Sequence, residues 1–222
     1  LISIASCSFI SNDFDSNDKD ELIIQLITYV LDEAHYLDVE IDDNFSEKVY
    51  NTFLENLDPY KRYFISSDIN EFSKYKYEID DYFKSPNSDF FELVYNRYSK
   101  RVSESKLIYE EILSSPFDFS KDEIFNLDTD KITYVENKIQ LSERWRKILK
   151  IYLIENFHDE IEDDKTKYND DNSFKIRSHD VIQKTLRKDL LQTMDDSYRF
   201  LQEELQRQDW FSVYINSFVS QY

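Results

Sequence analysis

The chain has 222 residues and a formal net charge of −19, with 41% hydrophobic and 16% aromatic residues. This apolar content predicts a folded core and excludes a disordered chain, whereas the negative charge argues against a nucleic-acid partner, because phosphate binding needs clustered Lys and Arg. Glycine is absent, which excludes the glycine-rich phosphate loops, dinucleotide turns and nucleophile elbows that depend on it.

The first residues are typical of a bacterial lipoprotein signal sequence. Ile4-Ala5-Ser6-Cys7 resembles a bacterial lipobox, in which the Cys is acylated and becomes the mature N-terminus. The acidic, aperiodic run that follows is typical of a solvated tether. We therefore predict that residues 1–19 comprise a signal-peptide remnant, a lipidation site at Cys7 and a tether. The alternative is that Cys7 is an ordinary thiol near a frayed terminus, and a single Cys forms no internal disulfide in either case.

From residue 20 onward apolar residues recur at helical spacing, so a first helix is predicted over about 20–37. Asn44, three residues before Glu47, predicts the capped start of a second helix that ends at Asp58-Pro59. Pro59 disfavours helix at Asp58 and lacks a backbone donor, which predicts a tight corner.

At this corner we expect Tyr60, Tyr63 and Phe64 to fill the space between helices, while Lys61 and Arg62 face water. A third helix is predicted to begin where Ser67 or Asp68 can cap it. Its apolar stripe is Ile69, Phe72, Tyr75, Ile79 and Phe83.

Asp89, three residues before Glu92, predicts the start of the longest helix, which Pro116 ends after about 40 Å. Residues 117–136 lose the periodicity and predict an ordered loop with short extended or helical pieces. A fifth helix contains Trp145 and Tyr152 on its apolar stripe.

The most polar stretch, residues 158–173, is interpreted as a mobile acidic insertion. Beyond it, one apolar face from Ile182 to Leu205 predicts a long helix, and Asp209 can cap a final short one. The predicted fold is all-α: an irregular array of six to seven helices, including one long helix, in a single domain over residues 20–222. At most two extended pieces are expected, and there is no internal repeat.

Residues that could carry chemistry are scattered. His35, His158 and His179 have no metal-ligand spacing, and the acidic run after His158 is either a loose site for a hard cation or a solvated loop. The pairs Asp80-Asp81 and Asp195-Asp196 point about 100° apart on a helix, so they are not expected to share a pocket. No Ser has a predictable base. We therefore predict no catalytic residue, no metal and no cofactor.

The aromatic residues, seventeen Tyr and seventeen Phe, either form a peptide-binding groove or fill the core. Most of them fall on the apolar stripes of the predicted helices, so packing in the core explains them first. The exceptions are Tyr60 and Tyr63 at the corner.

The order of several short motifs resembles one known family. The run from Phe45 to Phe72, FSEKVYNTFLENLDPYKRYFISSDINEF, resembles the N-terminal helical domain of bacterial periplasmic tail-specific, or C-terminal processing, proteases. The resemblance continues through Asp89-Phe90-Phe91 with Tyr95-Asn96-Arg97-Tyr98, through Pro116-Phe117-Asp118-Phe119 with Asn126-Leu127-Asp128, and into the Trp145 helix. It therefore extends over most of the chain from about residue 20.

This resemblance implies that the chain is the non-catalytic N-terminal domain of a serine endopeptidase. In the family, a PDZ domain captures the substrate C-terminus and a Ser-Lys dyad in a later domain cuts. The last residues, Trp210 to Tyr222, look like the helix that leads into the PDZ domain, so the natural chain is expected to continue into both. Neither the carboxylate-binding loop nor the dyad matches a position here.

The implied role is to form a wall around the protease core and to contact protein substrates or an adaptor. The implied location is the periplasm, at an inner or outer membrane, with the lipid on Cys7 as the anchor. A rival hypothesis is a complete lipid-anchored helical scaffold or peptide-binding protein.

Overall fold

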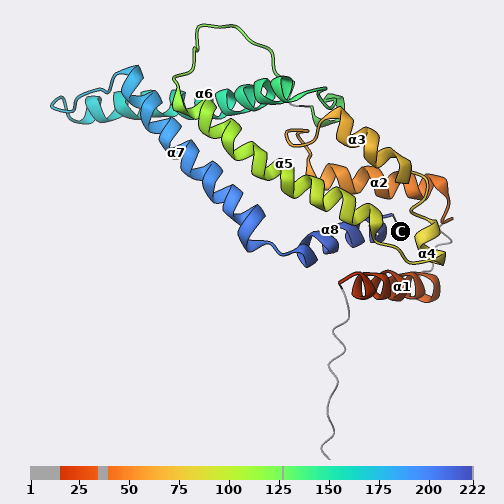
Figure 1. Ribbon diagram of the computed structural model, residues 1–222. Coiled ribbons are helices and arrows are strands. Elements are labelled where there is room, and N and C mark those ends of the chain that lie inside the picture. Colours follow the sequence, from red (N-terminus) through yellow and green to blue (C-terminus); the bar gives the residue numbers. More distant parts are fainter. Residues whose placement is uncertain (1–15, 35–39, 127, 222) are drawn as a thin grey trace, which may run out of the picture.

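The computed structural model describes residues 16–34, 40–126 and 128–221 (Figure 1), and over these residues the predicted all-α fold is confirmed. The longer helices are α1 Ser16–Ala34, α2 Asp43–Leu57, α3 Ser66–Phe72, α5 Asp89–Ser114, α6 Lys138–Asp170, α7 His179–Arg199 and α8 Arg207–Val219, and α4 Asp81–Lys84 is a single turn. In the described ranges the only extended pairing is an isolated bridge between Ile65 and Val135.

Helix α5 is the central rod of the array. The sequence predicted this segment to be the longest helix, but α5 has 26 residues and α6 has 33, because α6 continues through the acidic stretch. Helix α5 contacts α3, α6, α7 and α8, whereas α2 packs on α8 and α1 lies at the edge against α4 (Figure 1). The buried apolar residues form one continuous core that draws on α1 to α6 and α8, and partly buried residues of α7 pack against it. The described residues therefore form a single domain.

The core is dominated by aromatic rings. Phe53, Phe90, Phe91 and Tyr214 are fully buried, and the ring centroids of neighbouring members lie 5.0 to 6.3 Å apart, in the range of favourable aromatic contacts. These rings come from α2, α5 and α8. The prediction that most aromatic side chains serve packing is confirmed.

The starts of the helices differ in detail from the predictions. The N-cap of α2 is Asp42 rather than Asn44, because the Asp42 carboxylate accepts the Phe45 N–H at 2.9 Å. Asp68 lies inside α3, where it is buried and accepts the Ile65 N–H at 3.0 Å. Asp68 also binds the guanidinium groups of Arg97 and Arg101 of α5, so the same carboxylate joins two helices.

The apolar stripe predicted one helix over 69–83, but the structure interrupts this helix after Phe72. The backbone tightens into a 3-10 turn at Ser73–Tyr75 and resumes only as α4. The Ser46 hydroxyl of α2 donates to Asp80 Oδ1 at 2.6 Å and accepts from the Asp80 N–H at 2.8 Å. This buried link fixes the backbone just before α4, so a tertiary contact overrides the helical periodicity.

The prediction of an insertion at 158–173 is wrong for residues 158–170, because α6 continues through them to Asp170. The reason is Arg177, which donates to the fully buried Asp164 from its backbone N–H at 2.9 Å and from Nη2 at 2.6 Å, and to Glu160 at 2.5 Å. These bonds satisfy acidic side chains that would otherwise favour solvent. Only residues 171–178 form the connection.

Helices α6 and α7 then form a hairpin that projects from the rest of the molecule (Figure 1). The last predicted helix is divided: α7 ends at Arg199, a π-helical turn covers Phe200–Glu204, and α8 follows. Asp209 does stabilise the start of α8, by accepting the Gln206 N–H at 2.7 Å.

The predicted ordered loop at 117–136 is confirmed over its described residues, 117–126 and 128–136. It contains a 3-10 turn at Thr129–Lys131 and the Ile65 bridge. No helix in the described part of the chain has the length and apolar character that crossing a bilayer requires. Cys7 and the predicted tether lie outside the described residues, apart from the segment at 16–19, which begins α1.

Candidate functional site

The corner after α2 is organised by Asp58. Its carboxylate is buried and accepts three backbone N–H groups, from Arg62 at 2.7 Å, Tyr63 at 3.0 Å and Phe64 at 2.9 Å. Burial raises the pKa of the Asp58 carboxyl, whereas these hydrogen bonds act in the opposite direction. Lys61 takes the left-handed conformation at φ 48°, which Gly usually supplies. The Asp58 carboxylate therefore holds the turn that places the next side chains.

The first half of α6 fastens this corner. Trp145 Nε1 donates to the Arg62 carbonyl at 2.7 Å, and Arg144 Nη1 donates to the Lys61 carbonyl at 2.6 Å. Lys61 Nζ donates in turn to the carbonyl of Ile132 in the loop at 117–136, which we call the long loop. The prediction that Lys61 and Arg62 simply face water is wrong, because the Arg62 guanidinium lies 5.0 Å from the Trp145 ring centroid.

A hollow of about 230 Å³ lies beside the corner. It is lined by Tyr60, Arg62, Phe125, Ile148, Ile151, Tyr152 and Glu155. The expectation that Tyr60 fills the space between the helices is wrong, because this side chain is 41% exposed. Tyr152 is 43% exposed, so both rings are open to solvent. The corner supplies one wall, α6 supplies the floor residues, and Phe125 comes from the long loop.

Phe125 also lines two further hollows of about 190 and 310 Å³, and Lys147 of α6 lines both of them. The three hollows are thus neighbours around one aromatic side chain. We call them together the α6 groove, defined by Tyr60, Arg62, Phe125, Lys147, Ile148, Ile151 and Tyr152.

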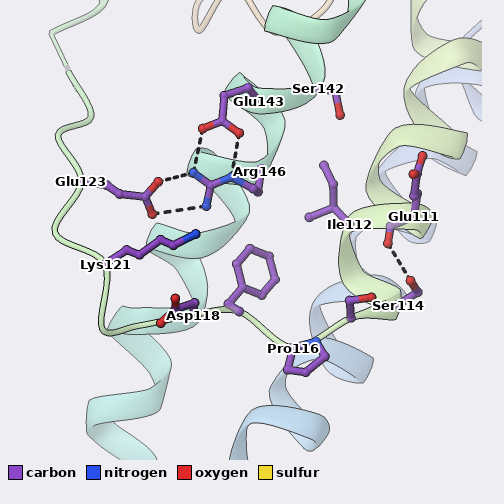
Figure 2. A pocket seen from close by; sticks show the side chains of 12 residues that line it. Glu111, Ile112, Ser114, Pro116, Asp118, Lys121, Glu123, Ser142, Glu143 and Arg146 are labelled. Atoms are coloured by element: carbon purple, nitrogen blue, oxygen red, sulfur yellow. Dashed lines mark hydrogen bonds and ion pairs between the residues drawn. The ribbon is translucent and has the colours of Figure 1, made fainter.

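The loop wall of the α6 groove is fastened by an ion cluster. Glu123 binds Arg146 and Lys150 of α6, and Figure 2 shows Glu123 and Glu143 on either side of the Arg146 guanidinium. The hydrogen bonds from Arg146 and then Lys150 lower the pKa of Glu123 to about 2. Glu123 is therefore ionised at neutral pH, and the loop is tied to α6.

A larger hollow of about 690 Å³ lies between the end of α5 and α6, and Figure 2 shows its lining. Its volume falls within the range of small-molecule sites, which is about 300 to 1,000 Å³. Such sites are mostly apolar, however, whereas Glu111, Asp118 and Lys121 line this one. Arg146 is already engaged by two carboxylates. The arrangement therefore indicates a solvated cleft.

The adjacent carboxylates diverge, as predicted. Asp80 binds Ser46 in the interior, whereas Asp81 pairs with Lys84 at the surface. Asp195 accepts the Tyr109 hydroxyl at 2.9 Å, whereas Asp196 pairs with Arg199. Neither pair forms a shared acid-base site. The Ser46 hydroxyl is used to connect α2 to the segment before α4.

The histidines and the acidic run also do not converge. The His179 ring packs edge-on against Phe157, 5.4 Å away, and His158 lies on α6. In the three described ranges no group of three His, Cys, Asp or Glu side chains is placed to hold a metal ion. Cys7, the predicted lipidation site, lies outside the described residues, as does His35.

Comparison with known proteins identifies the relatives of this fold. A model of the tail specific protease N-terminal domain family matches residues 27–222. The chain belongs to this family. The tail-specific protease of Haemophilus influenzae (strain ATCC 51907 / DSM 11121 / KW20 / Rd) is 24% identical over 130 residues. The match covers 58% of this chain but only 19% of that protein.

The match to the tail-specific protease N-terminal domain family includes the corner, α6 and the whole α6 groove. The family resemblance predicted from the sequence motifs is confirmed. The α6 groove itself was not predicted, because Tyr152 was assigned to the core and Phe125 to an aperiodic loop. One signal was present: Ile151, Tyr152 and Ile154 spread apolar side chains over more than one face of α6.

Proposed function

We propose that this chain is the non-catalytic N-terminal domain of a periplasmic tail-specific serine endopeptidase. It forms part of a wall around the protease core and contacts protein substrates or an adaptor. The observation that carries this proposal is the family match over residues 27–222. The name of the Haemophilus influenzae relative supports the same assignment.

The geometry of the domain supports a holding role. The corner, the loop at 117–136 and α6 are joined by partly buried hydrogen bonds, and α5 runs through the centre of the array. Two buried serine hydroxyls donate hydrogen bonds within their own helices. Ser105 donates to the Val102 carbonyl at 2.7 Å, and Ser217 donates to the Val213 carbonyl at 3.0 Å. A rigid helical frame with these bonds is suited to positioning other molecules.

The gene itself provides the first test. We expect the reading frame to continue past the Tyr222 codon into glycine-containing PDZ and protease segments with a Ser-Lys dyad. A stop codon directly after Tyr222 in the natural gene would contradict the proposal and favour a stand-alone scaffold.

A second test uses the purified 222-residue chain and an unfolded protein such as reduced casein. We expect no peptide-bond cleavage by mass spectrometry over hours, because the domain is proposed to be non-catalytic. Cleavage that disappears when one of the chain's own serines is replaced by Ala would overturn the proposal.

We also propose that a lipid on Cys7 anchors the protein to a membrane, and this is tested in bacteria that produce the natural precursor. We expect radiolabelled palmitate to be incorporated into the wild type and the Ser8→Ala control, and to be lost in Cys7→Ala. Incorporation into Cys7→Ala would show that Cys7 is not the lipidation site.

A further inference from the structure

We propose that the α6 groove binds extended segments of unfolded protein in which a carboxylate lies two residues away from a bulky apolar side chain. This inference rests on the proposed function in one respect, because it names the kind of substrate segment that the domain holds. Binding in the groove is nevertheless measured on the isolated chain, without any proteolysis.

The dimensions of the groove favour side chains over a cofactor. The hollow with Tyr60 and Tyr152 measures about 230 Å³ and its neighbours about 190 and 310 Å³. Sites for drug-sized molecules begin at about 300 Å³ and usually form one cavity. Three small adjacent hollows instead suit the anchoring side chains of an extended chain, in which successive residues point to opposite sides.

The walls of the α6 groove are fixed before any ligand binds. Glu123 ties the loop next to Phe125 to Arg146 and Lys150, and Trp145 ties the corner next to Tyr60 to α6. A preformed groove reduces the conformational entropy that binding costs. The exposed Tyr60 and Tyr152 rings can therefore contribute their apolar contact area to a ligand.

The charge of the groove selects an acidic ligand. Across the described residues each of the other arginines donates to a carboxylate or a backbone carbonyl. The Arg62 guanidinium instead lies over the Tyr63 and Trp145 rings, and although its charge opposes the burial that raises the pKa of the nearby Asp58 carboxyl, it forms no ion pair. Arg62 lines the hollow that contains both exposed Tyr rings. In an extended ligand, a carboxylate two residues away from an apolar side chain points to the same side, so it would meet Arg62 while the apolar side chain enters the hollow.

The other charged residues around the α6 groove also favour an acidic ligand. Six Lys or Arg and four Asp or Glu line the three hollows, although acidic residues outnumber basic ones by 46 to 27 in the whole chain. Glu155 is the acidic residue in the hollow with Arg62. It disfavours a second carboxylate in this hollow, so the ligand is expected to carry one acid, which meets Arg62, and apolar groups that contact the Tyr60 and Tyr152 rings.

The test uses fluorescence anisotropy of the purified chain with a labelled unstructured peptide that contains Leu-Ser-Phe-Ser-Asp, and with the same peptide in which Asn replaces Asp. We expect the Asp peptide to bind more tightly. Tyr152→Ala should weaken its binding by roughly tenfold, as for a central anchor residue. The matched control is Tyr168→Ala, because Tyr168 is 42% exposed on the same helix but outside the groove.

Arg62→Gln should bring the affinity for the Asp peptide to that for the Asn peptide, because it removes the charge and leaves the Arg62 carbonyl that accepts from Trp145. Arg62→Lys should restore the preference in part, and circular dichroism checks that each variant is folded. Equal loss in Tyr152→Ala and Tyr168→Ala, equal binding of both peptides by the wild type, or tighter binding of a single-stranded oligonucleotide would each overturn the inference.

The two proposals fail in different ways. A stop codon after Tyr222 contradicts the protease assignment without changing peptide binding by the isolated chain. Conversely, an α6 groove that binds no peptide leaves the reading-frame test intact.

Discussion

Tyr214 lies at the centre of the aromatic core. Its ring centroid is 5.0 Å from that of Phe53, 5.8 Å from that of Phe91 and 4.7 Å from that of Phe218. Its hydroxyl is buried and has no hydrogen-bond partner among the described residues. Burial raises the pKa of Tyr214 well above its ordinary value, so the hydroxyl stays protonated. The ring thus contributes packing, while the hydroxyl loses its bonds to water on folding.

Tyr214→Phe is therefore expected to stabilise the domain by about 1 kcal/mol, because it removes a polar group that folding leaves unsatisfied. Tyr109→Phe is the matched comparison: Tyr109 is also buried, but its hydroxyl donates to Asp195 at 2.9 Å. Tyr109→Phe removes this hydrogen bond and should destabilise the domain by about 1 kcal/mol. Urea denaturation measures both changes. Destabilisation by Tyr214→Phe would show instead that the hydroxyl has a bound water as its partner.

At the scale of the elements, α6 combines two different kinds of helix. Its first half is held by apolar contacts and by Trp145, whereas residues 158–170 carry mostly exposed polar side chains. Within this second half, Lys165 pairs with Glu162 at the surface, and Asp164 alone among the acidic residues is fully buried. The helix is thus stabilised at its far end by the contacts of Arg177 across the connection.

Replacing Arg177 by Ala should loosen this end of α6, because it removes the partner of the buried Asp164. We expect amide hydrogen exchange over residues 158–170 to accelerate by roughly tenfold or more, with no change in α5. Lys165→Ala is the control, since it removes an exposed pair from the same stretch. Unchanged protection in Arg177→Ala would mean that this part of α6 is stable without the ion pair.

The elements also show which features a sequence can predict. Helices α2 and α5 have apolar stripes bounded by Pro59 and Pro116, so their extents follow from local patterns. The second half of α6 lacks such a stripe and depends on Arg177, and the break after α3 depends on Ser46, 34 residues before Asp80. The α6 groove likewise needs Phe125 and Tyr60 to meet on α6. Such tertiary contacts have no local signature.

At the scale of the whole molecule, a chain of aromatic contacts links its two tryptophans. Trp210 of α8 lies 5.0 Å from the Tyr98 ring of α5, Tyr98 lies 5.3 Å from Tyr63 at the corner, and Tyr63 lies 5.8 Å from Trp145 of α6. The C-terminal helix, the central rod and the corner therefore share one packed interior.

This continuity predicts cooperative unfolding. The single-tryptophan variants Trp145→Phe and Trp210→Phe report on opposite ends of the aromatic chain, and we expect each one's fluorescence transition in urea to coincide with its own circular dichroism transition. A fluorescence transition that precedes the loss of helix in either variant would instead divide the chain into two independently unfolding parts.

The length of α6 has a mechanical consequence. One uninterrupted helix of 33 residues, about 50 Å, contacts the corner through Arg144 and Trp145, lines the α6 groove and ends in the projecting hairpin. A stiff lever of this kind converts a pivot of a few degrees at its clamped base into a swing of several ångströms at its free tip. A molecule that binds the hairpin end of α6 would therefore exert force on the same helix that lines the proposed peptide-binding groove.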